Sequence, residues 1–196
     1  MITTEQIKEL RDQTGVSIMQ CKKALEEAGG DAEKALIILK KKSGDIASKK
    51  SDRELSGGVI QAYVHGAGSV GVLIELLCET DFVAKNEEFK TLAYDVAMHI
   101  AAMNPEFVRK EDITEDKVAK AKEIFEQEVD AGKPVEIREK ILQGKLDAYF
   151  AQQILLEQPF VKRPEVTVGQ LISEGVQKFG EKIEVRRFVR YALLQG

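Results

Sequence analysis

The side chains that usually perform covalent chemistry are few and isolated in this sequence. The two histidines, His65 and His99, lack the paired ligands that a zinc site needs. Cys21 and Cys78 lie far apart, which fits reduced thiols in the cytoplasm better than a disulfide framework. The sequence holds neither a glycine-rich phosphate-binding loop nor a Gly-x-Ser-x-Gly elbow. We therefore expect a protein without enzyme activity, metal or cofactor.

A different kind of site is indicated by Thr80-Asp81-Phe82-Val83. An apolar run ends at residue 78, a helical pattern begins at Asn86, and these four residues form the junction. Taken alone, Phe82 would more often be a core residue and Asp81 a turn or capping residue. The position of Phe82, beside a carboxylate at a strand-to-helix turn, weakens that interpretation. On the residues alone, a buried and a presented Phe82 both stay open.

The composition describes a globular protein rather than a disordered one. Hydrophobic residues make up 43% and charged residues 32% of the 196 residues, enough for one domain of ordinary size and a small one. The net charge of −4 argues against broad nucleic-acid binding, which normally needs a basic face. The sequence has no run of 18 apolar residues and no signal-peptide pattern at its N-terminus, so we expect no membrane association and a cytoplasmic location.

Residues 1–53 are expected to form a small three-helix domain with a linker. Thr4, Ser17 and Asp31 are the predicted N-caps, and each helix carries apolar residues three or four positions apart. The apolar face fades after residue 42, and the stretch 43–56, rich in Ser, Lys and Asp, predicts a linker that is helical only in part.

Residues 54–196 are expected to form an α+β domain on a three-stranded antiparallel sheet. Strands are predicted near 57–65, at 70–78 and near 183–192. The run 70–78 is almost continuously apolar, which suggests that helices cover one face of the sheet and another subunit the other. In the third strand Ile183, Val185, Arg187 and Val189 alternate with Glu184, Arg186, Phe188 and Arg190.

Long helices are expected between the second and third strands. Asn86 and Thr114 are the predicted N-caps of the first two, and Gly132-Lys133-Pro134 breaks the second. Gly144 interrupts the helical pattern that follows. A last helix is expected over 168–179, closed by a glycine.

Two separate signatures carry a resemblance to a known family. Glu79-Thr80-Asp81-Phe82-Val83-Ala84-Lys85 resembles a signature of the elongation factor Ts family. The N-terminal signature of that family is similar to Leu10-Arg11-Asp12-Gln13-Thr14-Gly15, Ser17-Ile18-Met19 and Cys21-Lys22-Lys23-Ala24-Leu25. Further similar segments are Ala97-Met98-His99-Ile100-Ala101-Ala102, Pro105-Glu106-Phe107, Gly132-Lys133-Pro134, Gln158-Pro159-Phe160-Val161 and Val168-Gly169-Gln170-Leu171. The resemblance runs from about residue 5 to residue 190 and fits the short bacterial form with a single core domain.

This resemblance implies a translation elongation factor that acts as a guanine-nucleotide exchange factor. It would bind elongation factor Tu with its GDP and promote GDP release. Phe82, flanked by Thr80, Asp81 and Val83, would enter an apolar crevice of the GTPase domain. Its insertion would disturb the contacts that hold Mg²⁺ and the phosphates.

The resemblance also implies further contacts and an assembly. The N-terminal domain would have a ubiquitin-associated-like fold and contact the partner through Arg11, Ile18, Met19 and Lys22. Tyr63-Val64-His65-Gly66 matches a hairpin of the family, which makes His65 another candidate partner contact. The chain would pair with its twin through the sheet, giving a two-plus-two complex with elongation factor Tu.

Three positions depart from the family pattern. Gln20 stands where the family usually has an acidic residue, Ile18 where methionine is common, and Leu77 where asparagine is usual. The first two changes leave the apolar surface at residues 18 and 19 in place. Leu77 replaces a polar contact behind the Phe82 loop by an apolar one.

Other functions stay open on the residues alone. The three-helix unit could belong to an adaptor that the α+β part only dimerises, although an adaptor gains nothing from an exposed aromatic residue at position 82. Without the resemblance, Met19 would be a core residue in most three-helix units and Lys22 a solvated one. Nucleic-acid binding is opposed by the acidic balance of charge.

Overall fold

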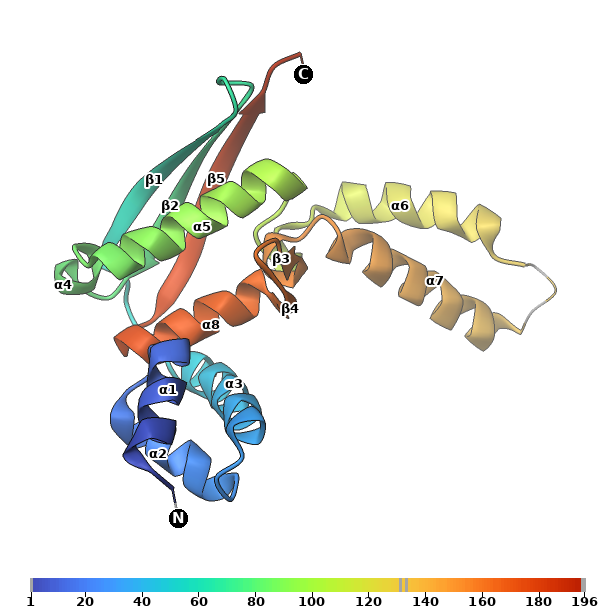
Figure 1. Ribbon diagram of the computed structural model, residues 1–196. Coiled ribbons are helices and arrows are strands. Elements are labelled where there is room, and N and C mark those ends of the chain that lie inside the picture. Colours follow the sequence, from blue (N-terminus) through green and yellow to red (C-terminus); the bar gives the residue numbers. More distant parts are fainter. Residues whose placement is uncertain (1, 131, 133, 195–196) are drawn as a thin grey trace.

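The computed structural model describes residues 2–130, 132 and 134–194. Its α-helices are α1 (Thr4–Thr14), α2 (Ile18–Glu27), α3 (Ala32–Lys49), α4 (Asp81–Ala84), α5 (Glu87–Met103), α6 (Glu115–Glu128), α7 (Val135–Ala151) and α8 (Val168–Phe179). Its strands are β1 (Gly57–His65), β2 (Val70–Cys78), β3 (Pro159–Phe160), β4 (Arg163–Thr167) and β5 (Ile183–Ala192). Short 3₁₀ turns lie at Lys110–Asp112 and Leu155–Glu157. Figure 1 shows a three-helix body (α1–α3), a sheet body (β1, β2 and β5 with α5 and α8) and a projecting arm (α6 and α7).

The three-helix body has a small apolar core of its own. Its buried members are Leu10, Val16, Cys21, Ala24, Leu25, Ala35 and Leu39. The prediction of Thr4 as the first N-cap is wrong by one residue. Thr3 is the cap because Thr3 and Gln6 form a capping box, in which each side chain accepts a hydrogen bond from the backbone amide of the other. The predicted caps at Ser17 and Asp31 are confirmed.

Helix α3 runs further than the hydrophobic pattern indicated. The stretch 43–56 is helical in part, as predicted, because α3 continues to Lys49. Ser43 is buried, and Ile46 and Ala47 pack against the core of the sheet body. Ala35 and Leu39 of α3 belong to the core of the three-helix body, and the helix also contacts α8. The apolar face fades after residue 42 because the helix changes its packing partner there.

The predicted three-stranded antiparallel sheet is confirmed, with strand order β1-β2-β5. Helix α5 lies across one face of the sheet, and α8 contacts both α5 and β5 (Figure 1). The core between them contains Val72, Ile74, Leu76 and Cys78 of β2 with Phe89, Val96 and Ile100 of α5. In the chain, α4 to α8 lie between β2 and β5.

The opposite face of the sheet, called here the open face, is exposed in the described chain. Large apolar side chains reach solvent there, namely Ile60, Val64, Leu73, Val189 and Tyr191. The strand register places Leu73 beside Ala62 on one side and Val189 on the other. We expected helices to cover one face of β2 and another subunit to cover the other. In the single chain, helices cover one face and the open face stays exposed.

A bulge in β5 splits the alternation expected for that strand. Two successive residues of β2 pair with Val185 and Arg187, which leaves Arg186 as an extra residue. An extra residue reverses the face of every side chain beyond it. Accordingly, Ile183 and Val185 are buried, whereas Arg187 and Val189 are exposed.

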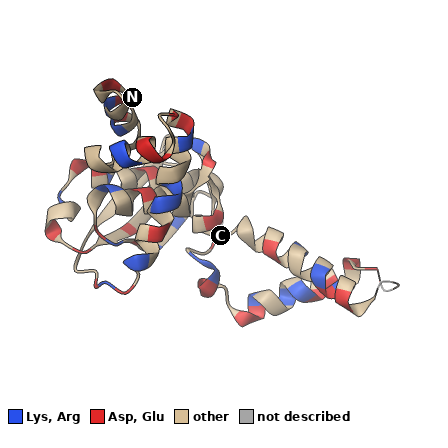
Figure 2. Cartoon of the chain, turned by 90° about the horizontal axis from the view of Figure 1, so that it is seen from below, with Lys and Arg blue, Asp and Glu red and all other residues tan. Residues whose placement is uncertain are grey.

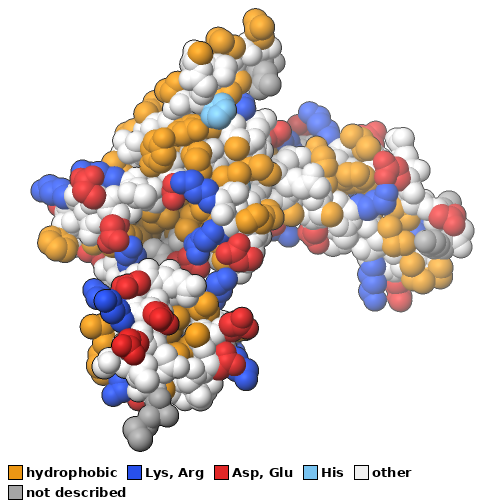
Figure 3. All heavy atoms as spheres, viewed as in Figure 1, with side chains coloured by type: hydrophobic (Ala, Val, Ile, Leu, Met, Phe, Trp, Pro, Cys, Tyr) orange, Lys and Arg blue, Asp and Glu red, His pale blue; other side chains and the backbone are white. Residues whose placement is uncertain are grey.

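The arm is an antiparallel pair of helices with a small core of its own, formed by Ala121, Leu146, Phe150 and Ile154. The predicted interruption at Gly144 is wrong, because α7 passes through it. A single helical glycine costs only about 1 kcal/mol relative to alanine. Of the predicted break at Gly132-Lys133-Pro134, Lys133 lies outside the described residues. Ile124 and Tyr149 on the arm are exposed. Figure 3 shows hydrophobic side chains at the surface of the arm.

The remaining helix predictions are confirmed in their positions. Asn86 caps α5 by accepting a hydrogen bond from the Glu88 amide at 2.8 Å. Thr114 occupies the cap of α6 without a side-chain hydrogen bond. Helix α8 spans the expected residues and ends at Gly180 in the left-handed conformation. The β3–β4 ribbon and α4 have no signal in the sequence pattern, since each element has only two to five residues.

Candidate partner-binding site

The turn after β2 exposes one aromatic side chain and buries the next residue. Thr80 is the N-cap of α4, and its hydroxyl accepts a hydrogen bond from the Val83 amide at 3.4 Å. Phe82 is 84% exposed, whereas Val83 is 4% exposed and belongs to the core of the sheet body. Successive helical residues point about 100° apart, so burying Val83 turns Phe82 outward. Phe82 is therefore not a core residue. Residues 80–83 are called the Phe82 turn below.

Asp81 is an exposed carboxylate beside Phe82. Its side chain comes within 4.0 Å of the Lys85 ammonium, and both groups are largely solvated. Such a surface pair contributes little to stability. A partner that engages Asp81 would therefore cost the protein little in lost internal contacts.

The backbone of the Phe82 turn lies directly against β1. A Cβ added to Gly57 would meet the carbonyl carbon and oxygen of Thr80 at 2.7 Å, so only glycine fits at this approach. The Ser56 hydroxyl donates to the Glu79 carbonyl at 2.5 Å, and the Cys78 thiol donates to the Thr80 carbonyl at 3.2 Å. The sheet thus fixes the turn from one side.

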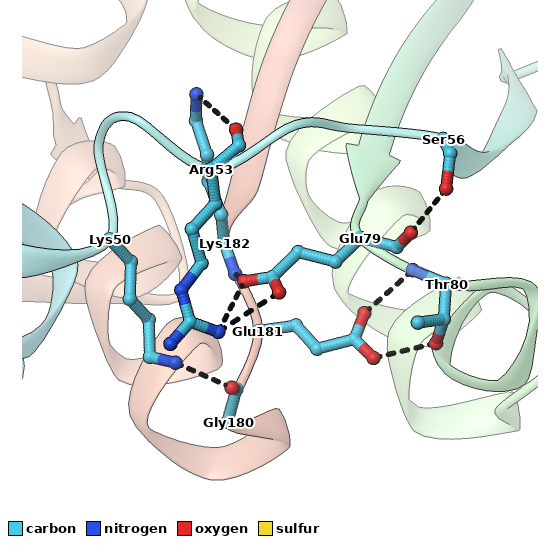
Figure 4. A network of polar contacts seen from close by, with 8 residues as sticks. All are labelled: Lys50, Arg53, Ser56, Glu79, Thr80, Gly180, Glu181 and Lys182. Atoms are coloured by element: carbon cyan, nitrogen blue, oxygen red, sulfur yellow. Dashed lines mark hydrogen bonds and ion pairs between the residues drawn. The ribbon is translucent and has the colours of Figure 1, made fainter.

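Glu79 ties the turn to the segment that joins the two bodies (Figure 4). Its carboxylate accepts hydrogen bonds from the Arg53 guanidinium at 3.0 Å and from the Lys182 amide at 2.5 Å. The Lys182 ammonium donates to the carbonyls of Ser51 and Arg53. Burial favours a raised pKa for Glu79, but the hydrogen bonds from Lys182 and Arg53 outweigh it and hold the pKa below its ordinary value. Glu79 is therefore ionised, and it holds the Phe82 turn to the segment between the three-helix body and the sheet body.

Two further exposed apolar side chains lie next to each other at the start of α2. Ser17 caps this helix, and the next two residues, Ile18 and Met19, are 55% and 62% exposed. Met19 is therefore not a core residue. Arg11, at the end of α1, is also exposed. Lys22 is exposed and lies 3.9 Å from the Glu26 carboxylate on the same helix.

His65 lies apart from these residues. It ends β1 at the hairpin tip, and its Nδ1 is 3.0 Å from the Tyr63 hydroxyl. Gly57, which supports the Phe82 turn, is at the other end of the same strand, roughly 26 Å away at the rise of a β-strand. His65 is therefore not part of the surface around the Phe82 turn.

The other potentially reactive side chains are buried and structural. His99 is fully buried between Gln158 and Val161. Burial raises the pKa of the Cys21 and Cys78 thiols, which makes them poor nucleophiles. Among the residues that the structure describes, no group of histidine, cysteine and carboxylate side chains could hold a metal ion.

Acidic and basic residues are interspersed over the described chain (Figure 2). The sequence as a whole carries 29 Lys and Arg against 33 Asp and Glu, so a basic surface for nucleic acid is not favoured. Within the described ranges, no helix is long and apolar enough to cross a bilayer.

An exposed aromatic side chain on a turn that is held by several contacts suits a protein that acts by binding another protein. The family model for elongation factor TS matches residues 40–195. The chain is 50% identical to elongation factor Ts of Carboxydothermus hydrogenoformans over 197 residues, covering 100% of this chain and 91% of the relative. It is also 50% identical to elongation factor Ts of Thermodesulfovibrio yellowstonii over 194 residues, covering 99% of this chain and 97% of the relative.

The chain belongs to the elongation factor Ts family. It is therefore a nucleotide-exchange factor of translation elongation and not an enzyme with covalent chemistry, as expected from its residues. Family membership implies elongation factor Tu as the partner. The sequence indicates Phe82 and its neighbours as candidate residues, but it gives no sign of the supporting contacts made by Arg53, Gly57 and Glu79. Those contacts join distant segments, which leave no periodic signal.

Proposed function

We propose that the protein binds GDP-loaded elongation factor Tu and releases GDP by inserting Phe82 into an apolar crevice of the GTPase domain. The observation that carries this proposal is the exposure of Phe82 on a turn whose backbone is fixed from several sides. The inserted ring would shift the elements that hold Mg²⁺ and the phosphates. Asp81 would orient the loop or add a polar contact beside the ring.

The energetic requirement follows from reciprocity between the two binding equilibria. A protein that binds the nucleotide-free partner more tightly than the GDP form weakens GDP binding by the same factor. An acceleration of ~10⁴ corresponds to about 5.5 kcal/mol of preference for the release-competent state. A phenylalanine hot spot supplies about 2–4 kcal/mol. Phe82 would therefore carry a large share, and a second contact is needed.

The three-helix body supports a second anchor. We propose that residues 1–53 form a ubiquitin-associated-like domain that contacts the same partner through Arg11, Ile18, Met19 and Lys22. The exposed apolar pair at the start of α2 would supply the buried area, and the two cations would lie at its rim. Two anchors on one partner raise the affinity through effective concentration.

The hairpin tip supports a weaker, third contact. We propose that His65 contacts elongation factor Tu from the end of the β1–β2 hairpin. The Tyr63 hydroxyl holds one ring nitrogen of His65, which leaves the rest of the exposed ring to a partner.

The open face of the sheet supports a homodimer. Its apolar side chains lie in rows across three strands, and an ion pair between Arg187 and Glu75 at 2.6 Å lies beside them. A contiguous apolar surface of this kind marks a protein interface, and two copies related by a two-fold axis bury the same surface on both. We propose that two chains pair here, giving a two-plus-two complex with elongation factor Tu.

The test is the release of fluorescent GDP from elongation factor Tu of the same organism. Wild-type protein should accelerate release, and Phe82→Ala should lower the stimulated rate about 30- to 1,000-fold, as the loss of one hot spot predicts. Ile124→Ala on α6, which removes an exposed apolar side chain far along the chain, is the matched control and should behave as wild type.

The outcomes separate two functions. A Phe82→Ala variant with full activity would show that insertion of the ring is not the mechanism. A wild-type protein that binds elongation factor Tu without accelerating release would favour the adaptor.

A further inference from the structure

One side chain holds the Phe82 turn from the side opposite to β1. It belongs to Glu181, which lies between the end of α8 and the start of β5. One carboxylate oxygen accepts the Thr80 amide at 3.0 Å, and the other accepts the Thr80 hydroxyl at 2.6 Å (Figure 4). The two residues are 101 positions apart in sequence, and both donors of Thr80 go to this one side chain.

This contact sets the direction of the Thr80 hydroxyl. Because its proton points to Glu181, its lone pairs are available to the Val83 amide, which completes the cap of α4. A helix of four residues does not hold itself by propensity and depends on such a cap. Hydrogen bonds to an ionised carboxylate are stronger than those between neutral groups. Glu181 thus fixes the turn that carries Phe82.

Glu181 is itself held in place on both sides. The carbonyl of the preceding residue, Gly180, accepts a hydrogen bond from the Lys50 ammonium at 2.7 Å. The amide of the following residue, Lys182, donates to Glu79, and Ile183 is buried in the core. The carboxylate of Glu181 is therefore presented from a fixed backbone rather than from a mobile loop.

We propose that Glu181 is a positioning residue for nucleotide exchange, holding Thr80 so that Phe82 projects in its binding orientation before the partner arrives. This inference rests on the proposed insertion of Phe82. Glu181 does not contact elongation factor Tu; it acts through Thr80. A turn that is ordered in advance avoids an ordering cost at the moment of binding, so more of the contact energy goes to displacing the nucleotide.

The test compares Glu181→Ala, Thr80→Val and the double variant in the release of fluorescent GDP from elongation factor Tu. The concentration of each variant is varied, which gives a maximal rate and the variant concentration at half-saturation. Glu181→Ala should lower the maximal rate roughly tenfold, equivalent to about 1.4 kcal/mol, and change the half-saturating concentration little. Thr80→Val should act similarly. The double variant should lose less than the two single losses combined, because both single variants remove the hydrogen bond between the Thr80 hydroxyl and the Glu181 carboxylate. Thr80→Ser, which keeps the hydroxyl, should retain most of the activity.

The controls separate positioning from charge and from folding. Glu139→Ala removes an exposed carboxylate on α7, changes the net charge equally and should behave as wild type. Should Glu181→Ala not fold, Thr80→Val against Thr80→Ser tests the same contact from its other side.

Two results would overturn the role of Glu181 and leave the proposed function standing. One is wild-type exchange by Glu181→Ala while Phe82→Ala is impaired; the other is additive losses in the double variant. A wild-type protein that does not accelerate release would instead overturn the proposed function, and this role with it.

Discussion

Gln20 of α2 accepts a hydrogen bond of 2.8 Å from the side-chain amide of Gln177 on α8. The bond joins the three-helix body to the sheet body. Gln177 is buried, so its amide group needs a partner within the protein. Gln20 therefore helps to hold the two bodies together, while Ile18 and Met19 beside it face solvent.

Replacing Gln20 by alanine should weaken the contact between the three-helix body and the sheet body. Gln20→Ala leaves a buried amide without its acceptor, which costs about 1–3 kcal/mol. Urea unfolding followed by circular dichroism should show a lower midpoint. Gln20→Glu keeps an acceptor and should be closer to wild type, and Gln127→Ala, which removes an exposed amide on α6, is the control. Equal midpoints for Gln20→Ala and wild type would mean that the bond does not stabilise this contact.

Hydrophobic period predicted the strands and most helices correctly, because those elements bury one face against a single partner. It failed where a face changes partner along one element. Helix α3 packs first in the core of the three-helix body and, beyond Ser43, against the core of the sheet body. The bulge at Arg186 reverses the face to which the later side chains of β5 point. The fading of the apolar face after residue 42 marks the first event but does not show which surface the helix packs against next. The bulge leaves no change in the local composition of the chain.

The candidate site was predictable in part. The residue types alone favour a buried Phe82, and its position at a strand-to-helix turn weakens that interpretation. Only the family resemblance indicates a presented aromatic side chain. The exposure of Phe82 depends on burial of Val83, and the support of the turn depends on Glu79 and Glu181. A carboxylate 101 positions away gives no signal in the neighbourhood of the turn.

The apolar pair on α2 should contribute to affinity rather than to the release step. Met19→Glu places a charge where the proposed interface buries a methionine, so the half-saturating concentration in GDP release should rise about tenfold or more. The maximal rate should change less. Ile37→Glu, at a residue 66% exposed on α3, is the matched control and should behave as wild type. An unchanged half-saturating concentration for Met19→Glu would exclude this contact.

The open face should control the oligomeric state. Leu73 lies in the centre of the apolar rows, and Leu73→Lys would bury an unpaired ammonium in the proposed dimer. Wild-type protein should sediment at twice the chain mass of 21.8 kDa, and the variant at the mass of one chain. Ile124→Lys makes the same chemical change on the arm and should leave the dimer intact. A wild-type monomer at micromolar concentration would rule the dimer out.

His99 is buried in its neutral form between two fixed partners. The Val161 amide donates to its Nδ1 at 3.2 Å, so Nε2 carries the proton and donates to the Gln158 side-chain oxygen at 2.9 Å. A second proton on Nδ1 would face the Val161 amide. Burial lowers the pKa of His99 and outweighs the opposing effect of the hydrogen bond with Gln158.

Because His99 is buried in its neutral form, the free energy of unfolding should fall as the pH is lowered through a defined window. The unfolded chain takes up a proton near pH 6.5, but the folded protein does so only at lower pH. The free energy of unfolding should therefore be constant above that value and fall below it, by up to about 1.4 kcal/mol per pH unit. The lowered carboxyl pKa values of Asp31, Glu79 and Asp147 act below about pH 4.5, outside this window. Urea unfolding at pH 7.5, 6.5 and 5.5 should show the fall in wild type and in the control His65→Gln, but not in His99→Gln. The same fall in His99→Gln would assign it to another group.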